Sequence, residues 1–496
     1  MPPPALTRRR FLALAGATAA SSALPQPAVA AAADALPALA ASLDGELVAA
    51  GHALYDSARR TASFNPRYDR YPLAMVGVRS EDDIARAIEF ARRHELPLAV
   101  RSGGHDVLAA SVCDAGIVVD TRFLTDVTVD DASGRVRAGA GVVAGAVNEA
   151  AGRRGRAVAL GCNSQVGVSG LTLGGGIGWF VGNHGATCDQ LLSARVVTVD
   201  GDLRIASRAD DADLFWAIRG GGGNFGVVSE WTFASHVQPD VVCGGIVFPG
   251  ELTPEFLAFY RDFLASAPDE LTVEVIGNAF REPMIAAAVC YSGEPGRAAE
   301  VLRPLREFAT PLADGIAVRP YAMLEAVPPD VARYLQPAPD VQEGEEPEPG
   351  SYWQGTTVAA LGDEVIDAIA GALNEAPPGW SFGLGHVMRG AVTRVGPAET
   401  PLLRTPGATT VHFDAGWNYR SRAGDLMRWV DAATAATAAV SGGVPTYVNY
   451  LSESTPAAVR DSYGANYPRL ARLKATYDPA NVLSGNRNVR PRAADA

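Results

Sequence analysis

Cysteine is scarce in this chain, and the spacing of its cysteines excludes two kinds of cross-linked fold. The 496 residues include 5 cysteines, an odd number, and no two of them form a C-x-x-C pair. Neither a disulfide framework nor a zinc cluster is therefore indicated. We expect most of these residues to be buried thiols: Cys113, Cys162, Cys188, Cys243 and Cys290.

The chain also lacks an excess of positive charge. It has 42 Lys and Arg residues against 55 Asp and Glu residues, a formal net charge of −13 at pH 7. We therefore expect a small-molecule ligand and no nucleic-acid partner. The length suggests two or three domains, and 48% hydrophobic with 20% charged residues is typical of globular proteins.

Histidine is sparse as well, with 7 residues. Five of them show no spacing typical of metal ligands, so the sequence predicts no metal site: His52, His94, His184, His236 and His412.

No hydrophobic run is long enough to span a membrane. Three arginines within residues 7–12 precede an Ala/Leu-rich run, and residues 28–30 form an A-x-A cleavage pattern. This combination predicts a twin-arginine export signal over residues 1–30, read by the twin-arginine translocation machinery, and a lead-in over residues 31–63. The run at 11–24 is interrupted by Gly, Thr and Ser and is shorter than the approximately 20 residues of a span, so we expect no stable membrane anchor.

An R-S-G-G-H loop at residues 101–105 follows an apolar run at residues 96–100 that predicts a short buried strand. Two consecutive glycines let backbone N–H groups converge and admit a bulky anion such as a diphosphate. His105 closes the loop, and a neutral imidazole can act as nucleophile, base or ligand. On its own the pentapeptide is more often a glycine turn that carries a solvated histidine, so the assignment depends on motifs elsewhere in the chain.

Two further segments are rich in glycine. Residues 167–179 contain six glycines among thirteen positions, too many for an ordinary core strand, so a flat ligand is expected against this backbone. Residues 221–226 match the dinucleotide pattern G-x-G-x-x-G. A helix-like run at 213–218 precedes it and a strand-like run at 227–233 follows it, which is the reverse of the Rossmann order and excludes that fold.

Hydrophobic periodicity predicts the elements between these segments. Ser80 begins a capping-box variant, and apolar residues at helical spacing continue until residue 95. Strands are expected at residues 116–120, 126–130, 135–141 and 189–200, and a helix at residues 143–152.

With these motifs in this order, residues 65–235 resemble the berberine-bridge-enzyme-like FAD-linked oxidases. The resemblance implies an α+β chain with a PCMH-type, two-subdomain FAD-binding domain at residues 64–240 and a substrate domain at residues 241–442. A segment at residues 443–496 would return to the FAD domain. His105 would be bonded to the 8α-methyl group of FAD. The implied cofactor contacts are Arg101, Ser102, Gly103, Gly104, His105, Gly139, Gly141, Val166, Gly167, Gly170, Gly174, Gly175, Gly176, Gly178, Gly226, Val228, Tyr447 and Asn449.

One departure from the family pattern concerns the number of covalent bonds to the flavin. Doubly tethered members carry a cysteine three residues before the valine of their V-G-x-G-G segment, and counting back from Val166 gives Asn163. Cys162 is one residue too early, and a one-residue slip turns a side chain to the opposite face. We therefore expect a single tether and interpret Cys162 as a structural thiol, although a local bulge would restore the second bond. Val166 resembles the position that controls oxygen access, and valine there favours an oxidase.

The second half of the chain has a different pattern. Residues 253–266 and 298–309 predict amphipathic helices, and residues 271–278 and 284–291 predict strands, which suits an antiparallel sheet covered by helices. The acidic, proline-rich residues 337–350 predict a surface loop or lid.

The C-terminal Y-x-N sequence resembles the closing motif of the family. On a strand, Tyr447 and Asn449 would share one face, and in the family this tyrosine lies beside the flavin and in several members removes a substrate proton. A phenol with a pKa near 10 needs a neighbouring cation or donor to act as a base. His386 and Arg389 are candidates for that group, or ordinary strand residues. Tyr450 and His386 are the alternative bases, and Tyr447 is otherwise a buried tyrosine at a domain seam.

These expectations predict a secreted FAD-dependent oxidase, extracellular, cell-wall-associated or periplasmic. It would transfer a hydride from an alcohol or an activated C–H or C–N centre of a sugar or natural product to covalent FAD, which O2 would reoxidise with release of H2O2. A dehydrogenase using another acceptor and a catalytically degenerate flavin- or ligand-binding protein are the alternatives. Ile177, where plant members place a tyrosine, is the sequence feature that favours the last of these.

Overall fold

The structure is a computed structural model that describes residues 26–62, 66–280, 282–323, 331, 334 and 348–492. The twin-arginine motif lies outside the described residues, as does most of the acidic segment predicted as a loop or lid. Residues 348–350 of that segment are described, and Gly350 begins a strand. Among the described residues, no helix combines the length and the apolar character that a membrane crossing requires.

The first sheet presents the R-S-G-G-H loop. Its four strands stand in the order β1-β2-β4-β3, with β2 and β3 parallel to β4, and the loop begins at the end of β3. Ser80 caps the following helix because its hydroxyl accepts a hydrogen bond from the Asp83 N–H at 3.2 Å, as the sequence predicts. The elements are β1 (Glu46–Ala49), β2 (Ala74–Gly77), α4 (Glu81–Arg93), β3 (Leu98–Arg101) and β4 (Ile117–Asp120).

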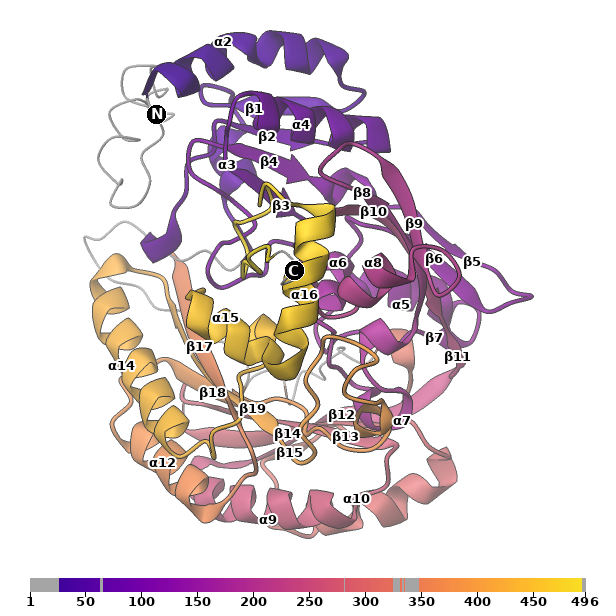
Figure 1. The fold of residues 1–496 in the computed structure, drawn as a ribbon. Coiled ribbons are helices and arrows are strands. Elements are labelled where there is room, and N and C mark those ends of the chain that lie inside the picture. The colour runs from indigo at the N-terminus through magenta and orange to yellow at the C-terminus, as the bar shows by residue number, and fades with distance from the viewer. Residues whose placement is uncertain are drawn as a thin grey trace.

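Helix α2 (Gln26–Ser42) packs on α4 at the end of the molecule farthest from the large sheet (Figure 1). The predicted cleavage pattern at residues 28–30 lies in its first turn, where Val29 is buried.

The second sheet carries the glycine-rich segments. It is antiparallel, with strand order β5-β6-β10-β8-β9. The glycine run at 167–179 begins as a short helix, and Ser169 on that helix accepts a hydrogen bond from the buried Trp231 indole at 2.8 Å. The elements are β5 (Val127–Val129), β6 (Arg135–Gly139), α5 (Ala144–Gly152), α6 (Val168–Leu173), β8 (Leu191–Val197), β9 (Leu203–Ser207), α8 (Ala212–Ala217) and β10 (Val227–Ala234).

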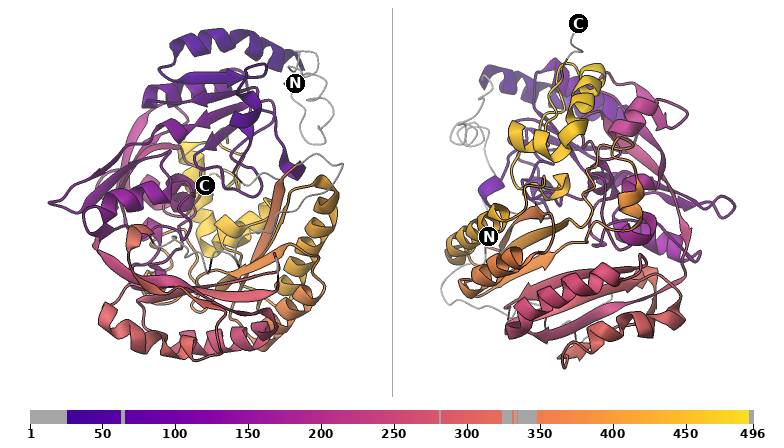
Figure 2. Two further views of the ribbon diagram at one scale, coloured as in Figure 1. Left: turned by 180° about the vertical axis from the view of Figure 1, so that it is seen from behind. Right: turned by 60° about the horizontal axis from the view of Figure 1, so that its bottom comes forward.

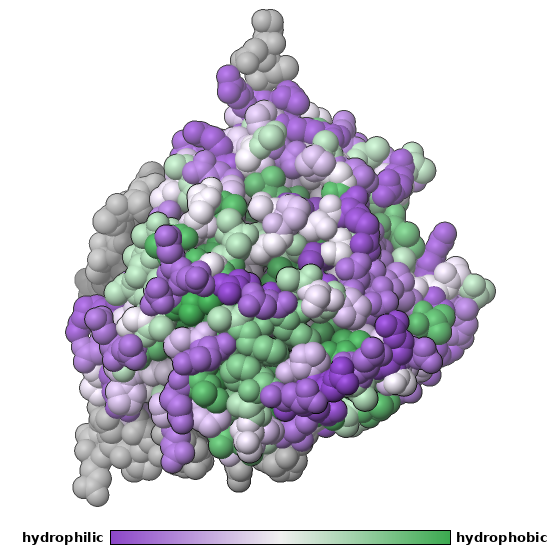
Figure 3. Space-filling model, turned by 90° about the horizontal axis from the view of Figure 1, so that it is seen from below, coloured by the Kyte–Doolittle hydropathy of each residue, from purple (hydrophilic) through white to green (hydrophobic). Residues whose placement is uncertain are grey.

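The third sheet is the largest, with eight antiparallel strands covered by helices on its outer face (Figures 1 and 2). Seen from below, that outer side exposes hydrophilic residues around a central hydrophobic area (Figure 3). The helix at 253–266 and the strands at 271–278 and 284–291 match their predicted bounds. The main elements are β12 (Asp240–Pro249), α9 (Thr253–Ser266), β13 (Leu271–Asn278), β14 (Met284–Tyr291), α10 (Ala298–Arg306), β17 (Gly350–Val358), α12 (Asp363–Asn374), β18 (Trp380–Leu384), β19 (Thr409–Trp417) and α14 (Arg420–Ala439).

After the third sheet the chain returns to the first two (Figures 1 and 2). Helices α15 (Pro456–Tyr463) and α16 (Tyr467–Tyr477) form this segment, and α16 contacts α8. Lys474, the only lysine in the sequence, is fully buried and forms an ion pair with Asp478 at 2.6 Å. Its ammonium also donates to the carbonyls of Asn224 and Leu483, both at 2.9 Å, and the bond to Asn224 fastens the segment to the loop that precedes β10 of the second sheet.

Candidate active site

A pocket lies where the glycine-rich segment, the third sheet and the C-terminal segment meet. The structure brings all three predicted catalytic side chains, Tyr447, Tyr450 and His386, into its wall. The other lining residues are Cys162, Ile177, Glu274, Thr357, Met388, Ala408, Thr409 and Thr410.

Tyr447 lies at the start of a short 3-10 turn, η7 (Val448–Tyr450), and is buried. Its hydroxyl oxygen accepts hydrogen bonds from the Gly176 N–H at 2.9 Å and from the Asn449 amide at 3.0 Å. Burial raises the pKa of Tyr447 above its ordinary value, while these two donors act in the opposite direction. The site therefore contains the donors that a phenolate would need.

The prediction of a strand at the Y-x-N sequence, residues 447–449, is wrong. The Tyr450 N–H donates to the Tyr447 carbonyl at 2.8 Å, and this bond closes a turn in place of an extended backbone. Tyr447 and Asn449 nevertheless meet, because the Asn449 side chain folds back onto the Tyr447 hydroxyl. The Asn449 amide also lies 3.3 Å from the Leu171 carbonyl, which joins the turn to helix α6.

Tyr450 also faces the pocket, and burial raises its pKa well above the ordinary value. Its ring lies 5.9 Å from that of Tyr447 and 5.3 Å from that of Trp353, measured between centroids. The Tyr450 phenol is therefore held protonated at neutral pH more strongly than a solvated tyrosine.

His386 follows β18 and is almost completely buried, with 1% of its side chain exposed. Burial lowers its pKa to about 3, so the imidazole is neutral at physiological pH. It cannot supply the positive charge suggested for it beside Tyr447. The same suggestion for Arg389 is wrong, since that guanidinium donates to the backbone carbonyls of Ala267, Pro268 and Leu271.

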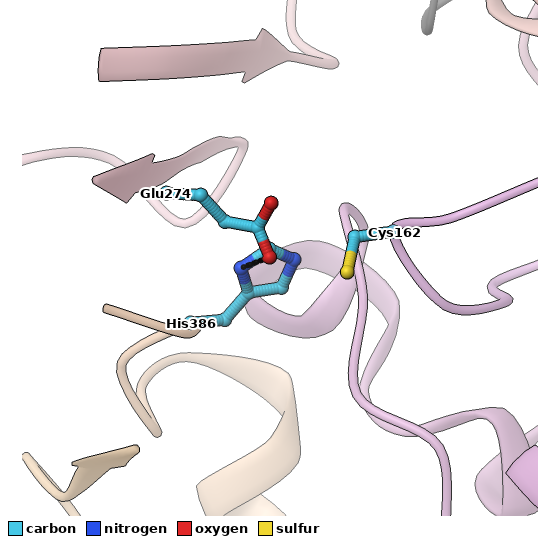
Figure 4. Close-up of side chains that lie close together, drawn as sticks. All are labelled: Cys162, Glu274 and His386. Atoms are coloured by element: carbon cyan, nitrogen blue, oxygen red, sulfur yellow. Dashed lines mark ion pairs between the residues drawn. The ribbon is translucent and has the colours of Figure 1, made fainter. Parts of the chain in front are cut away.

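Sequence reasoning did not single out Glu274, and it interpreted Cys162 as a structural thiol without placing it in a pocket. The thiol of Cys162 lines the pocket, beside the Glu274 carboxylate and the His386 imidazole (Figure 4). Glu274 lies 3.4 Å from His386 Nδ1. A signal for Glu274 exists, because it is an acidic residue within the apolar run of β13. No comparable signal marks Cys162, whose neighbours in the pocket come from distant parts of the sequence.

The R-S-G-G-H loop packs tightly against the segment at residues 163–167. The Ser102 hydroxyl donates to the Ala140 carbonyl at 2.8 Å, and the buried Arg101 guanidinium donates to the carbonyls of Ala58 and Arg60. Arg101 therefore fixes the loop to the preceding chain. His105 is half-buried, and burial lowers its pKa while a hydrogen bond with the Gln165 backbone raises it, leaving a neutral imidazole.

Most glycines predicted to contact a flat ligand are required by the protein itself. A Cβ on Gly103 would lie 2.4 Å from the Gly167 nitrogen, and one on Gly174 would lie 2.0 Å from Asn449 Oδ1. Among the predicted glycines, Gly170 alone has nothing within 4 Å of that position, and it is exposed on helix α6. Close contacts of the same kind involve Gly139, Gly141, Gly167, Gly176, Gly178 and Gly226. At Gly104 and Gly175 the nearest side-chain atoms would lie 3.2 Å and 3.0 Å from a Cβ, and both residues have a positive φ that favours glycine.

The remaining predicted contacts lie around the same loop. Val166 is half-buried and its carbonyl accepts from the Ala144 N–H at 2.9 Å, while Val228 is buried on β10. Asn163 uses its side-chain oxygen to accept from the Gln165 N–H at 2.8 Å. A neutral histidine, an open backbone position at Gly170 and an adjoining pocket together fit a bound FAD.

Comparison with known families agrees with this fit. The FAD binding domain model matches residues 72–207, and the berberine and berberine-like model matches residues 446–490. The chain belongs to the berberine-bridge-enzyme-like FAD-linked oxidoreductases. The predicted α+β fold class, FAD as cofactor and an FAD-dependent oxidoreductase activity are thereby confirmed.

Relatives of this oxidoreductase match over almost their whole length. (R)-6-hydroxynicotine oxidase of Paenarthrobacter nicotinovorans is 28% identical over 463 residues, 91% of this chain and 97% of that protein. The crystal structure of 6-hydroxy-D-nicotine oxidase from Arthrobacter nicotinovorans has a TM-score of 0.79 at 27% identity, covering 91% of this chain and 99% of the other. The xylooligosaccharide oxidase of Myceliophthora thermophila shares the fold, with a TM-score of 0.76 at 21% identity over 94% of this chain and 100% of the other.

Proposed function

We propose that this protein is an oxidase that removes a hydride from an activated C–N or C–H centre, or from an alcohol, of a small organic substrate held in the pocket beside Tyr447. The observation that carries this proposal is the Tyr447 hydroxyl, which lines the pocket and accepts two hydrogen bonds. FAD, when bound, accepts the hydride and passes the electrons to O2, giving H2O2.

Tyr447 is the proposed proton acceptor. The Gly176 N–H and the Asn449 amide would hold its oxygen as the proton arrives or leaves. Hydrogen bonds to the charged form of a group favour that form. The two hydrogen bonds partly offset the effect of burial, which disfavours the Tyr447 phenolate. The surrounding apolar side chains would exclude water from the reacting centre.

The name of one relative favours a C–N centre among the possible substrates. The pocket itself is lined mostly by side chains that are apolar or carry hydroxyl groups, with the Glu274 carboxylate among them. The relative named as a 6-hydroxynicotine oxidase supports a C–N centre over a sugar alcohol.

H2O2 release on a panel of amines, alcohols, sugars and aromatic natural products tests the oxidase proposal. Oxygen consumption with any of them supports it and excludes a binding protein. Turnover with quinones but not with oxygen would assign a dehydrogenase instead. Ile177 in the pocket wall, where plant members carry a tyrosine, is the observation behind the non-catalytic alternative.

A single covalent bond from His105 is the proposed attachment. Its imidazole is half-buried and neutral, so a ring nitrogen lone pair is free to act as a nucleophile. The residue at the second tether position is Asn163, which lacks a thiol. Acid-precipitated protein should stay yellow, the His105→Ala variant should release its flavin, and Cys162→Ser should retain it. A flavinylated peptide containing Cys162 would contradict this assignment.

Export by the twin-arginine pathway is a separate proposal that rests on the arginines at residues 8–10. Replacing Arg8 and Arg9 by Lys should leave the folded, flavin-loaded protein inside the cell. Cell fractionation checks this, and unchanged export of the double variant would contradict it.

A further inference from the structure

Three potential metal ligands converge in the pocket from three distant segments. Cys162 comes from the loop after β7 (Arg156–Ala157), Glu274 from β13, and His386 from the turn after β18. One ligand atom from each lies within 4.8 Å of the other two. Figure 4 shows the carboxylate and the sulfur approaching the imidazole from different sides.

His386 provides a second, independent observation. Both of its ring nitrogens are buried and form no hydrogen bond with any residue that the structure describes. The Glu274 carboxylate lies 3.4 Å from Nδ1 but does not form a hydrogen bond with it. A buried polar group without a hydrogen bond is destabilising, and coordination to a bound ion is one way in which a protein satisfies such a group.

The donor set indicates which ions would bind. Sulfur, imidazole nitrogen and carboxylate oxygen are the three ligand types of protein-bound Zn²⁺, whereas Mg²⁺ and Ca²⁺ take oxygen ligands. Ligand atoms around a tetrahedral Zn²⁺ lie about 3.2–3.8 Å apart, so these three would need to approach by about 1 Å. Side-chain rotation can supply a movement of that size.

We propose that Cys162, Glu274 and His386 bind a divalent cation of the Zn²⁺ class, with the fourth coordination position open to the pocket. On binding, the Cys162 S–H bond breaks, a sulfur–metal bond forms and the proton passes to solvent. A site with three protein ligands and one open position can take water or a neutral donor from a small molecule.

The chain offers a matched comparison. His412 and Asp414 form another histidine–carboxylate pair, with His412 Nε2 3.5 Å from the carboxylate, on the neighbouring strand β19. Among the described residues, no cysteine joins His412 and Asp414 in a group of three potential metal ligands. The other four cysteines are buried, whereas Cys162 is partly exposed, so Cys162 is the thiol expected to react with reagents in the folded protein.

Cobalt titration of the chelator-treated holoprotein tests the site, with Co²⁺ as a spectroscopic probe for Zn²⁺. We expect one equivalent of Co²⁺ to bind with d–d bands of a tetrahedral thiolate site, at longer wavelength than flavin absorption. Zn²⁺ should displace it and Mg²⁺ should not. Cys162→Ser, Glu274→Gln and His386→Gln should each weaken Co²⁺ binding at least about tenfold. Even residues that only support metal ligands typically cost about that much in metal affinity when they are changed. His412→Gln should bind as the wild type does.

Alkylation provides the second measurement, and it does not depend on variants of the buried histidine. Zn²⁺ should slow the reaction of Cys162 with iodoacetamide in the wild-type protein. Absence of bound Co²⁺, unchanged binding in Cys162→Ser, or alkylation unaffected by Zn²⁺ would overturn the proposal. None of these results depends on substrate turnover, so failure of the metal site and failure of the proposed oxidase activity remain distinguishable.

Discussion

At the scale of single residues, the site depends on how two opposing effects act on Tyr447. Burial raises the pKa of the phenol, and the hydrogen bonds from Gly176 and Asn449 lower it, with burial the larger effect. The phenol is therefore protonated at neutral pH, and the two donors lower the cost of removing its proton. A base of this kind gains strength as the pH rises.

Replacing Tyr447 by Phe tests the role of the hydroxyl directly. The ring and its packing remain while the proton acceptor is lost, so we expect flavin content and folding to survive. The rate of flavin reduction should fall by about 10² or more, the lower end of general-base contributions. Stopped-flow reduction measures this, and unchanged kinetics would move the assignment to Tyr450 or His386.

The pH dependence separates a tyrosine base from His386. Below its raised pKa, the deprotonated fraction of Tyr447 grows about tenfold per pH unit, so kcat/KM for a non-titrating substrate should rise steadily towards about pH 10. If His386 were the base, its pKa of about 3 would give a rate that is already level at neutral pH. A plateau between pH 6 and about 9 would count against Tyr447.

At the scale of elements, Gly174 links helix α6 to the turn η7. A Cβ there would lie 2.0 Å from Asn449 Oδ1, so Gly174→Ala should displace the amide that donates to Tyr447. We expect flavin reduction to slow by about 10- to 100-fold, because the ionised fraction of Tyr447 falls when a hydrogen bond to its charged form, typically about 1.5–3 kcal/mol, is lost.

A double-variant cycle checks the cause of that loss. Asn449→Ala should slow reduction to a similar degree, and combining it with Gly174→Ala should add little, because both act on one hydrogen bond. Gly371→Ala is the matched control, since nothing lies within 4 Å of its Cβ position on helix α12. Additive losses in the double variant would show that Gly174 acts elsewhere.

The elements that the sequence predicts best are those whose apolar residues recur at regular helix or strand spacing. Helix α9 and strands β13 and β14 have their predicted bounds because one face of each is apolar and the flanking residues break the pattern. The Y-x-N segment is too short to show a hydrophobic period. A single hydrogen bond from the Tyr450 N–H to the Tyr447 carbonyl closes it into a turn. The pocket residues Glu274 and Cys162 meet through tertiary packing, which no local pattern encodes.

At the scale of the whole molecule, the C-terminal segment holds the site together. It carries the turn with Tyr447 and continues into helix α16, which reaches the second sheet through the buried Lys474. Burial lowers the pKa of this ammonium, and the Asp478 carboxylate opposes that shift. Of these contacts, the bond to the Asn224 carbonyl joins the segment to the FAD domain, while Asp478 and Leu483 hold the ammonium in place from within the segment.

Removing the charge of Lys474 should loosen this closure. In Lys474→Met the Asp478 carboxylate stays buried without its partner, and such a loss costs about 3–5 kcal/mol of unfolding free energy. We expect a lower midpoint in urea denaturation of the holoprotein, followed by circular dichroism. Arg472→Met, on an exposed position of the same helix, should leave the midpoint nearly unchanged. Equal midpoints for the two variants would mean that the buried Lys474 ammonium does not fasten the C-terminal segment, and the hydrophobic packing of α15 and α16 would then have to account for its position.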